Sequence, residues 1–271
     1  MKFSIVTISF NQAEFLERTI RSVIDQQRDG FEIEYIVVDP GSTDGSRDII
    51  ERYRDQIAKI VYEKDKGPGD GLNKGFAHAT GDVFYYLNSD DTLEPGALKT
   101  VARYLKAHPD VDVAIGHAWL TDRHDRRLRR LWSEPFRRIP VAYGFAIQIQ
   151  PATFFRASAF ARTNGFNNDN RTNWDGELLV DLFTTGAKFG EVDAFLGTYR
   201  IYDGTFTSGK AMEERLAEWS RRRFEILMDR PWRASDRLMA AVLRLYKHAR
   251  DPRAAIERIV RGKVFQRKTA E

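Results

Sequence analysis

The hydrophobic and polar positions in the first third of the chain alternate between two spacings. Residues 3–10 are apolar or β-branched at nearly every position, as in a strand buried on both faces. The residues that follow place Phe15, Leu16 and Ile20 at helical spacing, with Asn11 as the expected N-cap. The pattern therefore predicts a strand followed directly by a helix.

The same alternation recurs further along the chain. It predicts strands at residues 34–38, 59–62 and 83–87 and helices from residue 46 and over residues 72–79. Strands that alternate with helices indicate βαβ units. We therefore expect an α/β fold with a mostly parallel central sheet and helices on both faces.

Beyond Asp91 the pattern is less regular. It predicts a helix at 94–107, a hairpin of strands at 111–121 and 128–132, a strand at 148–156 and a helix at 176–185. From Lys210 onward the composition is helical. We expect a first domain over residues 1–207 and a basic, amphipathic helical extension over residues 208–271.

The composition is that of a globular protein. The 271 residues are 42% hydrophobic and 30% charged, and no run of about 18 apolar residues or signal-peptide cleavage site is present. We therefore expect neither a transmembrane helix nor a signal peptide. The absence of cysteine excludes disulfides, zinc–thiolate sites and cysteine nucleophiles, and it favours a cytoplasmic location.

The net charge of +4 divides unevenly along the chain. Residues 210–271 carry 17 Lys and Arg against 9 Asp and Glu, a net +8, whereas residues 1–209 carry 26 against 30, a net −4. Basic amphipathic helices can lie on anionic membranes, so one hypothesis places the extension at the inner face of a membrane. The alternatives are that it packs on the acidic body or forms a homodimer.

Several common motifs are absent. The chain has no G-x-x-x-x-G-K-[ST] loop, no G-x-G-x-x-G after the first strand and no G-x-S-x-G elbow. These absences disfavour a P-loop NTPase, a nicotinamide-dependent Rossmann enzyme and an α/β-hydrolase. No signature of an RRM, KH or helix-turn-helix module accompanies the basic residues, so nucleic acid is not an expected partner.

Polar residues follow three of the predicted strands. They occupy residues 9–11, 39–45 and 88–91. Ligands of open α/β sheets bind at the carboxyl ends of the strands, so we expect these segments to form one site. A carboxylate there can hold Mg²⁺ or Mn²⁺ together with phosphate oxygens, which suits a nucleoside diphosphate leaving group.

Four segments of the chain resemble a known family. They read S-I-V-T-I-S-F-N-Q, V-V-D-P-G-S-T-D-G-S, E-K-D-K-G-P-G-D-G-L-N-K-G and A-T-G-D-V-F-Y-Y-L-N-S-D-D. Together they resemble the family 2 inverting glycosyltransferases of GT-A fold. The resemblance implies a Rossmann-like GT-A domain and a nucleotide-sugar donor, usually a UDP-sugar. It also implies hexosyl or N-acetylhexosaminyl transfer to a glycan or lipid-linked acceptor, in the assembly of a bacterial surface polysaccharide or glycolipid.

The resemblance also implies roles for individual residues of the donor site. Asp39 corresponds to the contact with the nucleobase, and the backbone at Ile8 and Ser9 lines the same pocket. The other implied donor contacts are Lys66 and Asp70 beside the base and diphosphate, Asn88 at a ribose hydroxyl, Asp90 as the ligand of Mn²⁺ or Mg²⁺, and Tyr202 at the diphosphate.

The family's catalytic base is an acid that precedes an amphipathic helix beyond the metal motif. Asp175 matches that context, with Glu177 in reserve, and residues 150–156 correspond to the strand on the acceptor side. Such a base takes the proton of the acceptor hydroxyl as it attacks the anomeric carbon. The alternative for Asp175 is an ordinary helix N-cap.

Two positions depart from the family pattern. Asn88 replaces the first acid of the metal motif, and Tyr202 stands where relatives often have a histidine. These departures predict a weak affinity for the metal or a weak dependence on it. Two alternatives to an active transferase remain open: a catalytically inactive relative that binds sugar nucleotides, and a nucleotidyltransferase.

A cluster of arginines occupies the predicted hairpin and the residues after it. Its members are Arg123, Arg126, Arg127, Arg129, Arg130, Arg137 and Arg138. One interpretation is attraction of an anionic acceptor such as a lipid diphosphate. The other is a solvated hairpin whose bases pair with Asp122, Asp125 and Glu134.

Overall fold

The computed structural model describes residues 1–170, 172–202, 210–250 and 252–261. The expected domain boundary at residues 207–208 lies outside these ranges. No helix within them combines the length and apolar character needed to cross a membrane.

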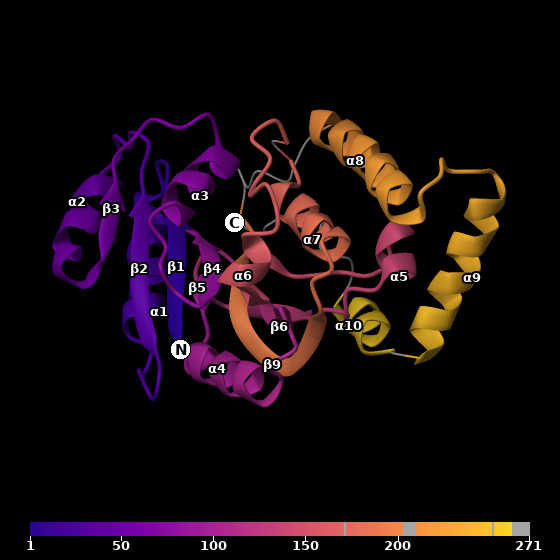
Figure 1. The fold of residues 1–271 in the computed structure, drawn as a ribbon, viewed down its shortest axis with the longest axis horizontal. Helices are drawn as coiled ribbons and strands as arrows, with labels where there is room; N and C mark the ends of the chain where they lie inside the picture. Colours follow the sequence, from indigo (N-terminus) through magenta and orange to yellow (C-terminus); the bar gives the residue numbers. More distant parts are fainter. Residues whose placement is uncertain (171, 203–209, 251, 262–271) are drawn as a thin grey trace.

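One nine-stranded sheet forms the centre of this part of the chain (Figure 1). Its strands are β1 (Lys2–Ile8), β2 (Glu32–Val38), β3 (Lys59–Val61), β4 (Val83–Asn88), β5 (Thr92–Leu93), β6 (Val113–Thr121), β7 (Arg127–Leu131), β8 (Thr153–Arg156) and β9 (Phe189–Arg200). They are ordered β3-β2-β1-β4-β8-β6-β9-β5, with β7 beside β6.

The first half of the sheet is parallel throughout. β1 lies between β2 and β4, and β3 extends the sheet beyond β2. Ile8, at the end of β1, lies opposite both Val38 and Asn88. The polar segments that follow these three strands therefore meet at one edge, as the sequence predicts.

The second half of the sheet is mixed. β8 is antiparallel to β4 and β6, whereas β9 is parallel to β6 and antiparallel to β5. β9 was not predicted, because Gly190, Glu191, Asp193 and Gly197 interrupt its hydrophobic pattern. Its end brings Arg200 and the residues after it to the same edge as the end of β4.

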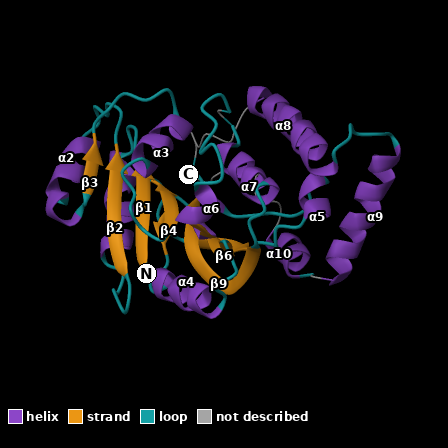
Figure 2. Ribbon diagram, viewed as in Figure 1, coloured by secondary structure: helices purple, strands orange, loops and turns teal. Residues whose placement is uncertain are grey.

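Helices cover both faces of the sheet (Figure 2). They are α1 (Ala13–Ile24), α2 (Ser46–Arg52), α3 (Pro68–Phe76), α4 (Ala97–Ala107), α5 (Arg138–Ala142), α6 (Ala157–Phe160), α7 (Trp174–Thr184), α8 (Lys210–Met228), α9 (Ser235–Arg250) and α10 (Arg253–Arg261). Apolar side chains of α1, α2 and α4 pack on one face, and those of α3, α5, α7 and α8 pack on the other. The expected α/β fold is confirmed.

The C-terminal helices are present, and α8 packs on the body. Trp219, Phe224 and Leu227 of α8 are buried in the same hydrophobic layer as α5 and α7. The Tyr143 hydroxyl donates a 2.6 Å hydrogen bond to Asp236 at the start of α9. In contrast, apolar side chains on α9 and α10 remain exposed.

Three local predictions need correction. α1 begins at Ala13 with Gln12 at the N-cap position, and Asn11 instead adopts φ 53°. Asparagine tolerates this left-handed conformation because its short polar side chain bonds locally. α3 begins at Pro68 rather than Leu72, since proline is favoured in the first turn of a helix. The segment 150–156 is a 3₁₀ turn (Gln150–Ala152) followed by the short strand β8.

Candidate functional site

Asp39 follows the end of β2. One of its carboxylate oxygens accepts hydrogen bonds, and the other has no partner among the described residues. Its Oδ1 accepts hydrogen bonds from the amides of Gly41 (3.0 Å) and Ser42 (2.8 Å) and from Nε of Arg47 (3.0 Å). Its Oδ2 is buried and has no hydrogen-bond partner in the described residues. The Ser9 hydroxyl at the end of β1 is likewise buried and unpartnered. This corner of the sheet edge therefore presents polar atoms that a ligand could satisfy.

The loops after β1 and β2 hold each other in place around Asp39. The Asn11 amide donates to the Ser42 hydroxyl (2.8 Å), and Asn11 Oδ1 accepts from the Thr43 amide (2.9 Å). The Arg47 guanidinium lies 4.5 Å from the ring centroid of Tyr62, a cation–π distance. The structure thus explains Asn11 as a brace for this corner.

The loop that carries Lys66 and Asp70 leads into α3. Asp70 Oδ2 accepts from the Lys66 amide (3.0 Å), and Asp70 Oδ1 accepts from Asn168 (3.3 Å). The Lys66 side chain is exposed. Asp70 therefore shapes this loop, and Lys66 is the member of the pair whose side chain is open to a ligand.

Asp90 lies beyond the end of β4, beneath the end of β9. Its Oδ2 accepts a 3.1 Å hydrogen bond from the Tyr202 hydroxyl, and its backbone carbonyl accepts from Arg200 Nε (2.6 Å). Burial raises the pKa of Asp90 and of the neighbouring Asp91, whose Oδ1 accepts from the Arg200 amide (2.8 Å). Tyr202 therefore forms a direct hydrogen bond with Asp90, the expected metal ligand.

The described residues contain no group of three or more His, Cys, Asp or Glu side chains arranged to hold a metal. The described residues thus form no metal site made of protein ligands alone. Asp90 nevertheless fits the kind of site in which Mg²⁺ or Mn²⁺ takes one or two carboxylates and completes its shell with phosphate oxygens and water.

Asn88 connects the carboxyl ends of β1, β2 and β4 to a cavity. Its Nδ2 donates to Gln150 Oε1 (3.2 Å), and Gln150 Nε2 donates to the Tyr86 carbonyl (2.7 Å). Gln150 also lines the cavity. This role was not predicted, although the polar Gln148 and Gln150 before an apolar strand are an available signal.

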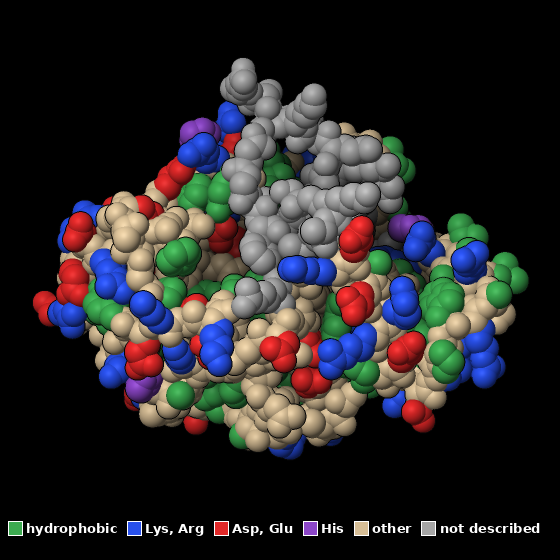
Figure 3. All heavy atoms as spheres, turned by 90° about the horizontal axis from the view of Figure 1, so that it is seen from above, with side chains coloured by type: hydrophobic (Ala, Val, Ile, Leu, Met, Phe, Trp, Pro, Cys, Tyr) green, Lys and Arg blue, Asp and Glu red, His purple; other side chains and the backbone are tan. Residues whose placement is uncertain are grey.

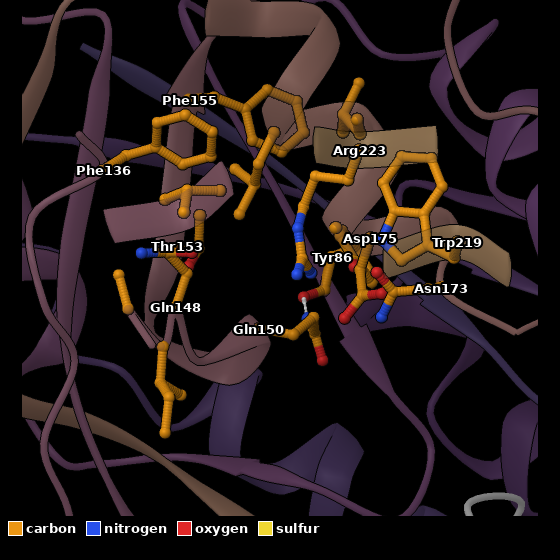
Figure 4. A pocket seen from close by; sticks show the side chains of 16 residues that line it. Tyr86, Phe136, Gln148, Gln150, Thr153, Phe155, Asn173, Asp175, Trp219 and Arg223 are labelled. Carbon is orange, nitrogen blue, oxygen red and sulfur yellow. Dashed lines mark hydrogen bonds between the residues drawn. The ribbon is translucent and has the colours of Figure 1, made fainter. Parts of the chain in front are cut away.

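The cavity lies under α8 and has a volume of about 200 Å³. Polar side chains from four separate segments project toward it (Figure 4). They are Tyr86, Gln148, Gln150, Thr153, Asn173, Asp175 and Arg223, with Trp219 at the wall. Burial raises the pKa of Asp175 above its usual value. A carboxyl group with a raised pKa in a cavity is a candidate general base.

The structure separates the two acids proposed as the base. Asp175 lies in the first turn of α7, whereas Asn173 occupies the N-cap position, so the N-cap interpretation of Asp175 is wrong. Glu177 is buried and accepts from Asn167 (3.0 Å) and Asn170 (2.6 Å). The hydrogen bonds of Glu177 hold the segment before α7, and only Asp175 of the two lines the cavity.

Several arginines of the β6–β7 hairpin pair with carboxylates. Arg123 pairs with Glu14 (2.5 Å), Arg126 with Asp122 (2.5 Å) and Arg127 with Glu94 (2.6 Å). Of the three predicted partners, Asp122 is confirmed, Asp125 instead pairs with Arg18 and Arg200, and Glu134 pairs with Lys247. These pairs favour a structural role for the paired bases of the hairpin.

Relatives of known sequence match part of the chain. An uncharacterized glycosyltransferase of Nostoc sp. is 34% identical over 131 residues, which cover 47% of this chain and 40% of that protein. The putative teichuronic acid biosynthesis glycosyltransferase TuaG of Bacillus subtilis is 34% identical over 105 residues, which cover 38% of this chain and 41% of that protein. The chain thus spans about two fifths of the length of these relatives.

A solved structure shares the fold over nearly the whole chain. The crystal structure of Staphylococcus aureus TarS in complex with UDP-GlcNAc superposes with a TM-score of 0.68 at 18% identity, covering 93% of this chain and 73% of that one. Residues 4–163, more than half of the chain, match the family model described as Glycosyl transferase family 2. The chain belongs to this glycosyltransferase family.

Proposed function

We propose that the chain transfers a sugar from a UDP-sugar to an acceptor hydroxyl with inversion at the anomeric carbon. The observation that carries this proposal is the continuity between the strand ends and the cavity. Gln150 touches Asn88 at the end of β4 and lines the same cavity as Asp175. A nucleotide along the strand ends would thus present its sugar toward a buried carboxylate.

Recognition of the base is assigned to Asp39 and Ser9. The unpartnered Asp39 Oδ2 is an acceptor for an imide N–H, which uracil presents. Lys66, Asn88 and the backbone at Ile8 complete the proposed donor contacts. Support for UDP as the carrier comes from TarS, which was crystallised with UDP-GlcNAc.

Asp175 is the proposed general base. It would accept the proton of the acceptor hydroxyl as that oxygen attacks the anomeric carbon and the bond to the diphosphate breaks. Asp175 is the one carboxylate among the described residues that line the cavity. A double displacement in glycosyl chemistry uses a second carboxylate as the nucleophile, so a single carboxylate suits a single displacement, which inverts the configuration.

A divalent cation, Mn²⁺ or Mg²⁺, is the proposed cofactor, with Asp90 as its protein ligand. When bound, the ion would neutralise the charge that develops on the departing diphosphate. The Tyr202 hydroxyl orients Asp90 Oδ2 through its 3.1 Å hydrogen bond and lies beside the proposed diphosphate position. Asn88 contributes no negative charge here, so the diphosphate itself must supply part of the coordination.

Chelation should therefore weaken nucleotide binding. We expect EDTA to lower the affinity for UDP by about tenfold or more, since Asp90 would hold the ion and the ion would supply positive charge to the diphosphate. Calorimetric titration measures this effect, with uridine as the control because it lacks the diphosphate. An equal loss for uridine, or no loss for UDP, would contradict a metal at Asp90.

A panel of UDP-sugars tests the reaction itself. UDP release above the rate of spontaneous hydrolysis, from a hexose or N-acetylhexosamine donor, is the expected result. Tight UDP binding without release from any donor would instead favour an inactive relative. Release of pyrophosphate from a nucleoside triphosphate and a sugar phosphate would favour a nucleotidyltransferase.

The names of two relatives suggest the setting of this reaction. TuaG is assigned to teichuronic acid biosynthesis, and TarS is described as a poly(ribitol-phosphate) N-acetylglucosaminyltransferase. We propose a cell-surface polysaccharide or glycolipid as the product, with a glycan or lipid-linked acceptor.

We also propose that α9 and α10 bring the protein to an anionic membrane surface. Leu238 and Leu245 on α9 are each 72% exposed, and Ile259 on α10 is 83% exposed. The exposed bases Arg237 and Arg244 lie on the same helix α9. Hydrophobic and basic side chains gather at the end of the molecule where α9 lies (Figure 3). An apolar surface with adjacent bases suits anionic lipid head groups.

Vesicle binding tests this surface without truncating the chain. We expect co-sedimentation with phosphatidylglycerol vesicles, weak binding to phosphatidylcholine vesicles and loss of binding in the double variant Leu238→Ser/Leu245→Ser. The substituted side chains are exposed, so the fold should be retained. Unchanged vesicle binding would contradict the proposal. A dimer that the double variant dissociates, without any vesicle binding, would assign the surface to self-association.

A further inference from the structure

Three hydrogen-bond donors at the cavity have no acceptor. The Tyr86 hydroxyl, the indole Nε1 of Trp219 and Nε of Arg223 are buried atoms without a partner among the described residues. The side chains of Tyr86 and Trp219 are only 4% and 5% exposed. Buried donors without acceptors are rare because each gives up its hydrogen bonds to water. Three such donors indicate a ligand that is rich in oxygen acceptors.

Arg223 adds a positive charge to these donors. Burial lowers the pKa of its guanidinium, Arg223 forms no ion pair among the described residues, and arginine remains charged in proteins. Figure 4 shows the side chain extending into the cavity toward Gln150 and Tyr86. Gly144 leaves room for it, since a Cβ there would lie 2.9 Å from Nη2 of Arg223. A half-buried cation without an ion-pair partner in the described residues suits an anionic ligand.

The position and size of the cavity restrict that partner. Asp175 lines the same space, so the ligand lies at the reacting centre of the proposed transfer. The volume of about 200 Å³ is smaller than the roughly 300–1,000 Å³ typical of pockets for drug-sized ligands, which suits one sugar unit. Arg223 lies on α8, beyond residues 4–163 that match the family model.

We propose that this cavity selects a sugar unit bearing a carboxylate or phosphate and that Arg223 is the residue that determines this specificity. The inference rests on the proposed function, because Asp175 would act on that unit or on its acceptor. A bidentate contact from the guanidinium to the oxyanion is the expected geometry. The Tyr86 hydroxyl and Trp219 Nε1 would donate to ring or hydroxyl oxygens of the same sugar.

Matched pairs of probes test the charge preference by calorimetry. Methyl β-D-glucuronide against methyl β-D-glucoside, and glucose 6-phosphate against glucose, report on an anionic acceptor. UDP-glucuronate against UDP-glucose reports on an anionic donor sugar. Each pair is measured with the wild-type protein, with Arg223→Gln and with Arg221→Gln. Arg221 is the matched control because it is an exposed arginine on the same helix.

The wild-type protein and Arg221→Gln should prefer the charged member of at least one pair by about tenfold or more, and Arg223→Gln should lose that preference. The pair that discriminates identifies whether donor or acceptor carries the anion. No preference in any pair, or a preference that survives Arg223→Gln, would overturn the proposal. The glycoside and sugar phosphate pairs contain no nucleotide, so they test the cavity even if UDP fails to bind. Failure of UDP to bind would refute the proposed function but not the charge preference of the cavity.

Discussion

Replacing Asp175 by Asn is expected to lower the rate of sugar transfer by about 10²- to 10⁴-fold while UDP binding is unchanged. The substitution keeps the shape of the side chain but removes the atom that accepts the proton. Asp175 lines the cavity, whereas the proposed donor contacts lie at the strand ends. Turnover is measured as UDP release, and UDP affinity by calorimetry. The matched control is Asp181→Asn, further along α7 and outside the cavity lining.

The free energy of unfolding separates this effect from a loss of fold. Burial raises the pKa of Asp175, so the charged form of this carboxylate is destabilised in the folded protein. Asn removes that destabilisation, and Asp175→Asn should be at least as stable as the wild type in urea. A variant that is less stable and binds UDP poorly would contradict a purely catalytic role.

The pH profile of turnover follows from the same raised pKa. The base must be deprotonated, so kcat should fall as the pH decreases through the pKa of Asp175. Since burial raises that pKa, the acid limb should lie above the value of about 4 for an ordinary aspartate. Turnover that persists unchanged down to that value would exclude Asp175 as the base.

Replacing Asp39 by Asn is expected to weaken UDP binding by about 10- to 100-fold. Oδ1 would still accept from Gly41, Ser42 and Arg47, but Oδ2 would become an N–H donor. Two donors would then face each other where uracil presents its imide N–H. Calorimetric titration with UDP measures the loss.

Asp48→Asn is the control for this second variant, since Asp48 is exposed on the adjacent helix α2. It should bind UDP as the wild type does. If Asp39→Asn also bound UDP normally while retaining its fold by circular dichroism, Asp39 would not contact the base.

The parallel half of the sheet and its polar edge were predictable from sequence, because local patterns determine them. Ser9, Asp39 and Asn88 each follow a hydrophobic run, and parallel strands bring their ends to one edge. Asp175 was selected through the family resemblance and the helix predicted after it, and its role as the base stays a prediction. These predictions needed no knowledge of long-range packing.

The cavity was not predictable in the same way. Its polar lining combines Tyr86 on β4, Gln150 in a 3₁₀ turn, Asp175 on α7 and Arg223 on α8. In the sequence, Arg223 belongs to a run of basic residues on an amphipathic helix, which is typical of a solvated face. Only the packing of α8 against α5 and α7 turns one of these arginines inward.

The interaction of Tyr202 with Asp90 also depends on long-range structure. β9 carries Tyr202 to the end of β4, and β9 was missed because polar residues interrupt its pattern. The same strand positions Arg200, which holds the Asp90 carbonyl and the Asp91 carboxylate. β9 reaches this position by pairing with β6, which is distant in the sequence. No local periodicity therefore predicts the contact between Tyr202 and Asp90.

Amide chemical shifts recorded during a UDP titration report whether a nucleotide binds along the ends of β1, β2 and β4. We predict saturable shift changes concentrated in residues 8–11, 39–46 and 88–91, with smaller changes at Tyr202. A titration that leaves these amides unchanged, or that shifts only amides of α9 and α10, would contradict the account.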